Sequence, residues 1–87
     1  MSVIYCAVDM FALSQAVRLV DENGITTTIY ATAADLPATI ANLCKEKNIT
    51  NVHLYGNANY LNEIATTINT TYNLNYHRGN PLNIEVN

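Results

Sequence analysis

Residues 53–64 read HLYGNANYLNEI, and this stretch joins the end of a predicted strand to the start of a predicted helix. A short apolar run stops at Gly56-Asn57, and apolar side chains then recur at helical spacing from Leu61 onward. Asn57 is a residue type that caps helix N-termini well. Because ligands in α/β proteins gather where strands end and helices begin, Gly56, Asn57 and Asn59 are candidate binding residues.

The segments on either side of this junction show strand and helix patterns. The run VIYCAV is continuously apolar, and Asn23-Gly24 predicts a tight hairpin turn. The sequence predicts strands at residues 3–8, 16–21, 25–31, 51–55 and 82–86, one helix at 32–48, a second helix capped by Asn57 with an apolar stripe reaching Tyr72, and a turn or loop at 73–81.

These elements predict a single α/β domain over residues 1–87, with a five-stranded mixed sheet and two helices. The element order is β-β-β-α-β-α-β, and crossovers between parallel strands are right-handed. The VIYCAV pattern is typical of a strand buried on both faces, so this strand should lie at the centre. The hairpin then extends one side and the last two strands the other, which gives the spatial order 3-2-1-4-5.

Few charges cover the surface of this small domain. Hydrophobic residues make up 49% of the chain and charged residues only 13%, while thirteen Asn and ten Thr supply polarity. Soluble domains usually carry about 25% charged residues. The composition therefore favours a chain that hides surface against copies of itself or a protein partner; the alternative is a genome whose base composition favours Asn codons.

Charge and hydropathy also exclude some classes of function. The net charge is −3 with four cations, so nucleic-acid binding driven by phosphate contacts is disfavoured. No stretch approaches the roughly 18 apolar residues that a membrane-spanning helix needs, so no membrane partner is expected.

Cysteine and histidine supply no recognisable chemistry. Cys6 and Cys44 lie in apolar patterns typical of small buried hydrophobes, which we favour over a disulfide. His53 and His77 lack the spacing of a zinc site. The sequence thus predicts no catalytic residue, metal site or cofactor.

The element order and the tripeptide VDM at residues 8–10 resemble the ribonuclease H-like superfamily, over residues 3–86. That resemblance implies carboxylates holding two divalent metals, on the first strand, on the first helix and just past the fourth strand. Asp9 matches the first position, but the position past the fourth strand is Gly56-Asn57, and Asp35 and Glu46 lie at the two ends of the helix. The resemblance therefore implies the fold without nuclease activity.

Asp9 is the remaining candidate binding residue, because it follows the first strand directly. The alternative, which we favour, is an aspartate that caps the turn into MFALS. A ligand at the strand ends around Asp9, Gly56, Asn57 and Asn59 stays open as a small-molecule hypothesis.

The leading functional hypothesis is a non-enzymatic protein that acts through protein–protein contacts, as a homo-oligomer or a subunit of a larger assembly. Thr26, Thr28 and Tyr30 are candidate interface residues, because their strand has few charges and no proline to protect an edge. The short, Asn/Thr-rich chain also resembles small proteins of tailed bacteriophages, which implies a place in the host cytoplasm or the virion. The alternative is a degenerate nuclease-like domain that retains weak nucleic-acid or nucleotide binding.

Overall fold

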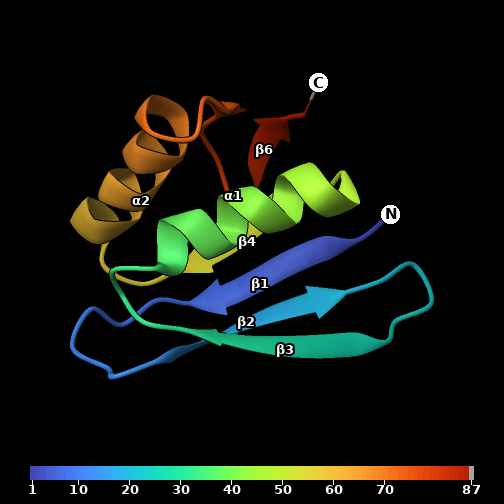
Figure 1. Cartoon of the computed structure of the whole chain (residues 1–87), viewed down its shortest axis with the longest axis horizontal. Helices are drawn as coiled ribbons and strands as arrows, with labels where there is room; N and C mark the ends of the chain where they lie inside the picture. The colour runs from blue at the N-terminus through green and yellow to red at the C-terminus, as the bar shows by residue number, and fades with distance from the viewer. Residues whose placement is uncertain (87) are drawn as a thin grey trace.

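The computed structural model describes residues 1–86, which form one mixed sheet with two helices packed on it (Figure 1). The elements in chain order are β1 (Val3–Ala7), β2 (Gln15–Val20), β3 (Thr26–Ala31), α1 (Leu36–Lys47), β4 (Asn51–Tyr55), α2 (Ala58–Thr70), β5 (Asn75–His77) and β6 (Leu82–Glu85). The sequence-based prediction of α/β character with two helices is confirmed. Each predicted element is present, although α1 begins only at Leu36, after a turn that starts near Thr32.

The sheet has six strands in the order β3-β2-β1-β4-β6-β5, so the predicted number of five strands is wrong. The five predicted strands do lie in the predicted order, because the strand predicted at 82–86 is β6, which pairs with β4. The extra strand, β5, lies within the predicted loop at 73–81 and pairs antiparallel with β6. β6 in turn pairs antiparallel with β4, and therefore separates β5 from β4. β5 escaped prediction because its three residues, NYH, contain one apolar side chain and show no measurable alternation.

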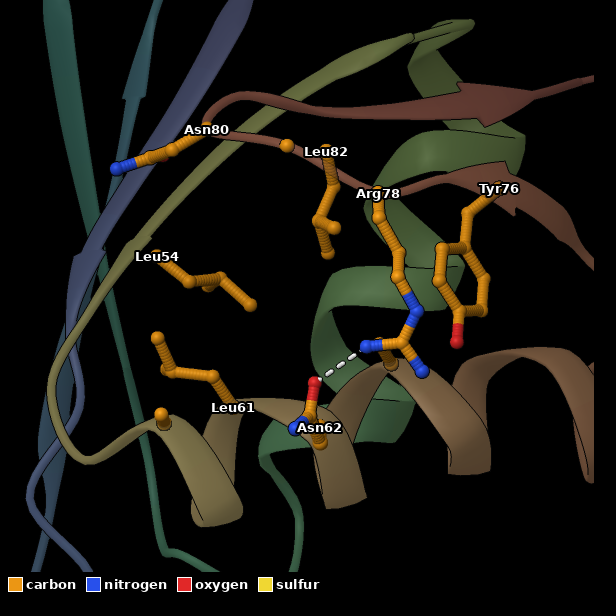
Figure 2. A pocket seen from close by; sticks show the side chains of 10 residues that line it. Leu54, Leu61, Asn62, Tyr76, Arg78, Asn80 and Leu82 are labelled. Atoms are coloured by element: carbon orange, nitrogen blue, oxygen red, sulfur yellow. Dashed lines mark hydrogen bonds between the residues drawn. The ribbon is translucent and has the colours of Figure 1, made fainter.

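The β5–β6 hairpin reaches α2 through two side chains, Tyr76 and Arg78 (Figure 2). Its turn contains Arg78-Gly79-Asn80-Pro81, as the sequence predicts. The hairpin thereby forms one side of the space between α2 and the far end of the sheet.

Both helices cover the same face of the sheet. The β3-α1-β4 and β4-α2-β5 connections move in the same direction across the sheet, and two right-handed crossovers of that kind place their helices on one side. The prediction that the first strand is buried on both faces is therefore wrong, since alternate residues of β1 are buried and the others are not. Its central position, with β2 and β4 as neighbours, is as predicted.

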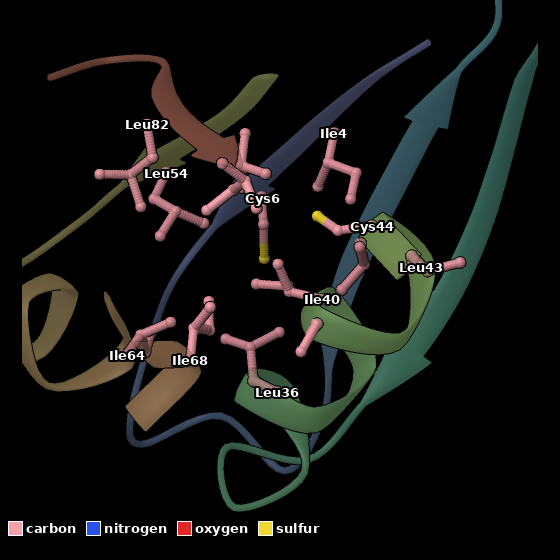
Figure 3. Packing of buried hydrophobic residues seen from close by; sticks show 14 of the residues in the cluster. Ile4, Cys6, Leu36, Ile40, Leu43, Cys44, Leu54, Ile64, Ile68 and Leu82 are labelled. Atoms are coloured by element: carbon pink, nitrogen blue, oxygen red, sulfur yellow. The ribbon is translucent and has the colours of Figure 1, made fainter. Parts of the chain in front are cut away.

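The core lies between the helices and this covered face (Figure 3). Its fully buried side chains come from both layers: Ile4, Cys6, Val17, Val52, Leu36, Ile40, Cys44, Ile49, Ile64 and Ile68. Each buried aliphatic side chain of this size contributes roughly 1.5–3 kcal/mol through removal from water.

The two cysteines are free and buried, which confirms their interpretation as small hydrophobic core residues. Burial raises the pKa of the Cys44 thiol to about 11. Burial also raises the pKa of the Cys6 thiol, although the positive charge of Arg18 opposes that shift. Both side chains therefore remain thiols at neutral pH and are poor nucleophiles.

Neither helix in residues 1–86 is long and apolar enough to cross a lipid bilayer.

Candidate functional site

The carboxyl ends of β1 and β4 lie side by side, which brings the candidate binding residues to one end of the sheet. The backbone N–H of Val8 donates to the carbonyl oxygen of Tyr55 at 2.6 Å. Asp9 follows Val8, and Gly56 follows Tyr55. Asp9, Gly56, Asn57 and Asn59 thus gather where the fold would place a ligand, and their hydrogen bonds show what each one does there.

Gly56 is required by the close approach of two backbone segments. Its φ angle is +148°, and a Cβ atom at this position would lie 2.5 Å from the carbonyl oxygen of Val8. Such a contact is far inside van der Waals distance, so only glycine fits without displacing β1. The close approach of the segments that follow β1 and β4 therefore explains this glycine without a ligand.

Asn57 caps α2, as the sequence predicts. Its Oδ1 accepts hydrogen bonds from the backbone N–H groups of Asn59 at 3.0 Å and Tyr60 at 3.3 Å. These N–H groups have no partner within the helix, so the cap occupies two of the donors that would otherwise be free to bind an anion. The Asn59 side chain is exposed, and only its backbone N–H participates in the cap.

Replacing Asn57 with alanine should lower the free energy of unfolding by about 1 kcal/mol, because the first turn of α2 loses its acceptor. Urea denaturation of Asn57→Ala and the parent chain measures this difference. Asn59→Ala is the matched control, since it removes an exposed side chain two positions away. Equal losses in the two variants would contradict the capping role.

Asp9 organises the turn that follows β1, as the favoured interpretation expects. Its Oδ1 accepts a hydrogen bond from the backbone N–H of Phe11 at 2.9 Å, and its own N–H donates to Oε1 of Gln15 at 2.7 Å. Gln15 is a residue that the sequence analysis missed. Its side chain is only 4% exposed, and its Nε2 has no hydrogen-bond partner among residues 1–86.

The donor set does not fit the pair of metals that the ribonuclease H-like resemblance implies. Each divalent cation of that kind takes about six oxygen ligands, so several carboxylates must converge. In the described part of the chain, no three His, Cys, Asp or Glu side chains come close enough to hold a metal ion. Asn57, which occupies the position past β4, uses its side-chain oxygen to cap α2.

The face of the sheet opposite the helices has no covering layer in residues 1–86. The strand registers place these side chains on it: Val3, Tyr5 and Ala7 from β1; Ala16, Arg18 and Val20 from β2; Thr26, Thr28 and Tyr30 from β3; Asn51, His53 and Tyr55 from β4; Asn83 and Glu85 from β6; and Asn75 and His77 from β5. We call this set the open face. All three candidate interface residues, Thr26, Thr28 and Tyr30, therefore lie on it and are exposed.

Aromatic side chains form a row at the centre of the open face. The rings of Tyr5 and His53 stack with centroids 4.7 Å apart, and His53 and Tyr55 follow at 6.5 Å. The Arg18 guanidinium lies 5.8 Å from the centroid of Tyr5, within the range of a cation–π contact. The available sequence signal for this row was the alternation of His53 and Tyr55 in NVHLY, together with Tyr5 in VIYCAV.

One end of the open face continues into an apolar loop between β1 and β2. Met10, Phe11 and Leu13 are 51%, 89% and 94% exposed. With Tyr30 and Tyr55, these residues account for five of the seven large exposed hydrophobic side chains in residues 1–86. Such a concentration of exposed apolar side chains marks an interaction surface.

Comparison of the chain with protein-family models, with curated proteins and with solved structures found no match.

Proposed function

We propose that this chain is a non-enzymatic α/β protein that works as a self-associating subunit, and that the open face is where two copies meet. The observation that carries the proposal is the apolar end of the sheet, where Phe11 and Leu13 of the β1–β2 loop are almost fully exposed and where Tyr30 and Tyr55 also lie exposed. Exposed side chains of this size favour association, because contact with a partner removes their apolar area from water.

The dimensions of the open face suit a second copy of the chain. Six strands spaced about 4.8 Å apart and about five residues long give a flat sheet area of roughly 500 Å². The side chains add further surface to this area. A standard interface buries about 800 Å² per partner. The sheet face together with the Met10–Leu13 loop is of that size, and two sheets can pack face to face about 10 Å apart.

The charges on the open face are complementary under two-fold symmetry. Arg18 lies on β2, on one side of the central pair β1–β4, and Glu85 lies on β6, on the other side. A two-fold axis parallel to the strands places the Arg18 side of each copy over the Glu85 side of the other. Because the strand registers place Glu85 about four residues farther along the sheet than Arg18, the two charges lie on the same side of the interface without facing each other directly, and their attraction favours the symmetric dimer.

Thr28→Lys should raise the dimer dissociation constant about tenfold, because contact with the second copy would remove the added ammonium from water with no acid on the facing strand β5. Thr27→Lys is the matched control: it adds the same charge to the neighbouring residue of β3, which points to the other side of the sheet. Sedimentation equilibrium over a concentration series measures both constants. Equal effects of the two substitutions on the dissociation constant would show that the open face is not the interface.

A parent chain that stays monomeric at high concentration would overturn the proposal. In that case the row of Tyr5, His53 and Tyr55 favours the second candidate function, weak binding of single-stranded nucleic acid by base stacking. Retention of a fluorescent oligonucleotide at low salt and its release at modest salt would support that candidate instead.

The resemblance to small proteins of tailed bacteriophages extends the proposal to the setting of the dimer. A virion or a complex assembled in the host cytoplasm would then hold the subunit, and additional protein partners would contact it there.

A further inference from the structure

A pocket of about 250 Å³ lies on the helix side of the sheet, between the end of β4, α2 and the β5–β6 hairpin (Figure 2). Its floor is aliphatic: Leu54 comes from β4, Leu82 from β6 and Leu61 from α2, and all three point into the space. Ala58 and Ala65, both small residues on α2, leave the room that larger side chains would fill. The pocket is therefore an apolar cavity with one open side.

Arg78 lies along one side of this pocket (Figure 2). Its guanidinium reaches from the hairpin to α2, where Nη1 donates a hydrogen bond to Oδ1 of Asn62 at 2.7 Å. Arg78 makes no salt bridge within residues 1–86, and this bond to a neutral amide is its only hydrogen bond there. A guanidinium carries five N–H donors, so its charge and most of its donors remain available.

Neighbouring acids do not neutralise Arg78. Glu85, the acid nearest in the β5–β6 hairpin, lies 2.8 Å from Nε2 of His77. Glu63 follows Asn62 on α2 but does not line the pocket; it lines a neighbouring hollow with Asn59, Asn62, Thr66 and Thr67. The pocket thus carries one positive charge that has no salt-bridge partner within residues 1–86, beside an apolar floor.

We propose that this pocket binds a small apolar group that carries a single carboxylate. The guanidinium geometry matches a carboxylate through two parallel hydrogen bonds, while the leucine floor matches a ring or a short alkyl chain. A cavity of about 150 Å³ accommodates benzene, so the 250 Å³ here holds a ring with a short acidic arm. A phosphate group is a poorer match, because no second cation lines the pocket.

The pocket and the open face lie on opposite sides of the sheet, since Leu54 and Leu82 belong to the covered face. Ligand binding is therefore independent of the proposed dimer, and each can fail without the other. An apolar group with a single carboxylate occurs both in a free aromatic acid and in the C-terminal residue of a peptide. Two kinds of probe, a small acid and a peptide, distinguish these two ligands.

Phenylacetate is the first probe and phenylacetamide its neutral match, with binding measured by chemical-shift changes in two-dimensional amide NMR spectra. We expect phenylacetate to shift the resonances of Leu54, Leu61 and Gly79, and to bind about tenfold more tightly than the amide. A short peptide ending in phenylalanine, with a free or an amidated C-terminus, tests the second source. Tighter binding of the free peptide than of phenylacetate would assign the pocket to peptide ends.

Arg78→Gln should weaken phenylacetate binding about tenfold and leave amide binding unchanged. Lys47→Gln is the matched control, because it removes the same charge from an exposed residue outside the pocket. Ala58→Phe, at the exposed rim, should abolish binding by filling the space while the remaining spectrum reports an intact fold. Equal affinity for acid and amide, no binding of either up to their solubility, or no effect of Arg78→Gln would each overturn the proposal.

Discussion

Gly56→Ala is expected to lower the free energy of unfolding by about 3 kcal/mol, a large share of the stability of an 87-residue domain. The added Cβ would meet the carbonyl oxygen of Val8 at 2.5 Å, and the backbone φ of +148° is one that residues other than glycine rarely adopt. The clash is with backbone rather than with a flexible side chain. Relief therefore requires β1 and β4 to separate where Val8 donates to Tyr55.

Gly24→Ala provides the matched control for this substitution. Gly24 also has a positive φ, +80°, but a Cβ atom there would have no neighbour within 4 Å. We expect its cost to be about 1 kcal/mol, which is the conformational penalty alone. Urea denaturation of both variants separates the two contributions, and equal losses would show that the Val8 contact is not what makes Gly56 necessary.

Local sequence features predicted the local structure around these glycines. Asn23-Gly24 indicated the β2–β3 hairpin, and Gly56-Asn57 indicated a strand end followed by a capped helix, because turns and caps depend on residues close together in the chain. The apolar run VIYCAV was misread because its burial depends on more than its own residues. A continuous run shows that both faces of β1 are apolar, but whether a second layer covers them depends on elements distant in sequence.

Some parts of the candidate site could likewise be predicted from nearby residues, and other parts could not. The roles of Asn57 and Asp9 in a cap and a turn were accessible from the sequence, since their partners lie within three residues. The aromatic row of the open face was not accessible from the sequence alone, because Tyr5 and His53 stack only after β1 and β4 pair in parallel. The pocket required the β5–β6 hairpin, whose first strand was too short to recognise.

Gln15→Glu is expected to destabilise the fold by about 3 kcal/mol at pH 7 and by much less at pH 4. Gln15 is 4% exposed, and its Nε2 has no acceptor in residues 1–86. The substitution replaces that nitrogen with an oxygen, so a negative charge would be buried with no cation beside it. Burial and the nearby carboxylate of Asp9 both raise the pKa of the introduced carboxyl in the folded state.

The pH dependence follows from the direction of that shift. Below the unfolded-state pKa of about 4.3 the carboxyl is neutral in both states, and it can still accept the hydrogen bond from the Asp9 N–H. As the pH rises above that value, the unfolded chain loses the proton first, so the stability of the variant falls until the folded-state pKa is passed. Thermal or urea unfolding of the variant and the parent between pH 4 and pH 8 measures this difference.

Gln15→Met separates charge from the loss of the amide. It removes the Nε2 without a partner together with the Oε1 that accepts from Asp9, so we expect a loss of about 1 kcal/mol that does not vary with pH. A Gln15→Glu variant whose stability follows the parent at every pH would show that water or a cation reaches this position. The buried amide would then belong to a solvated site behind the Asp9 turn rather than to the closed core.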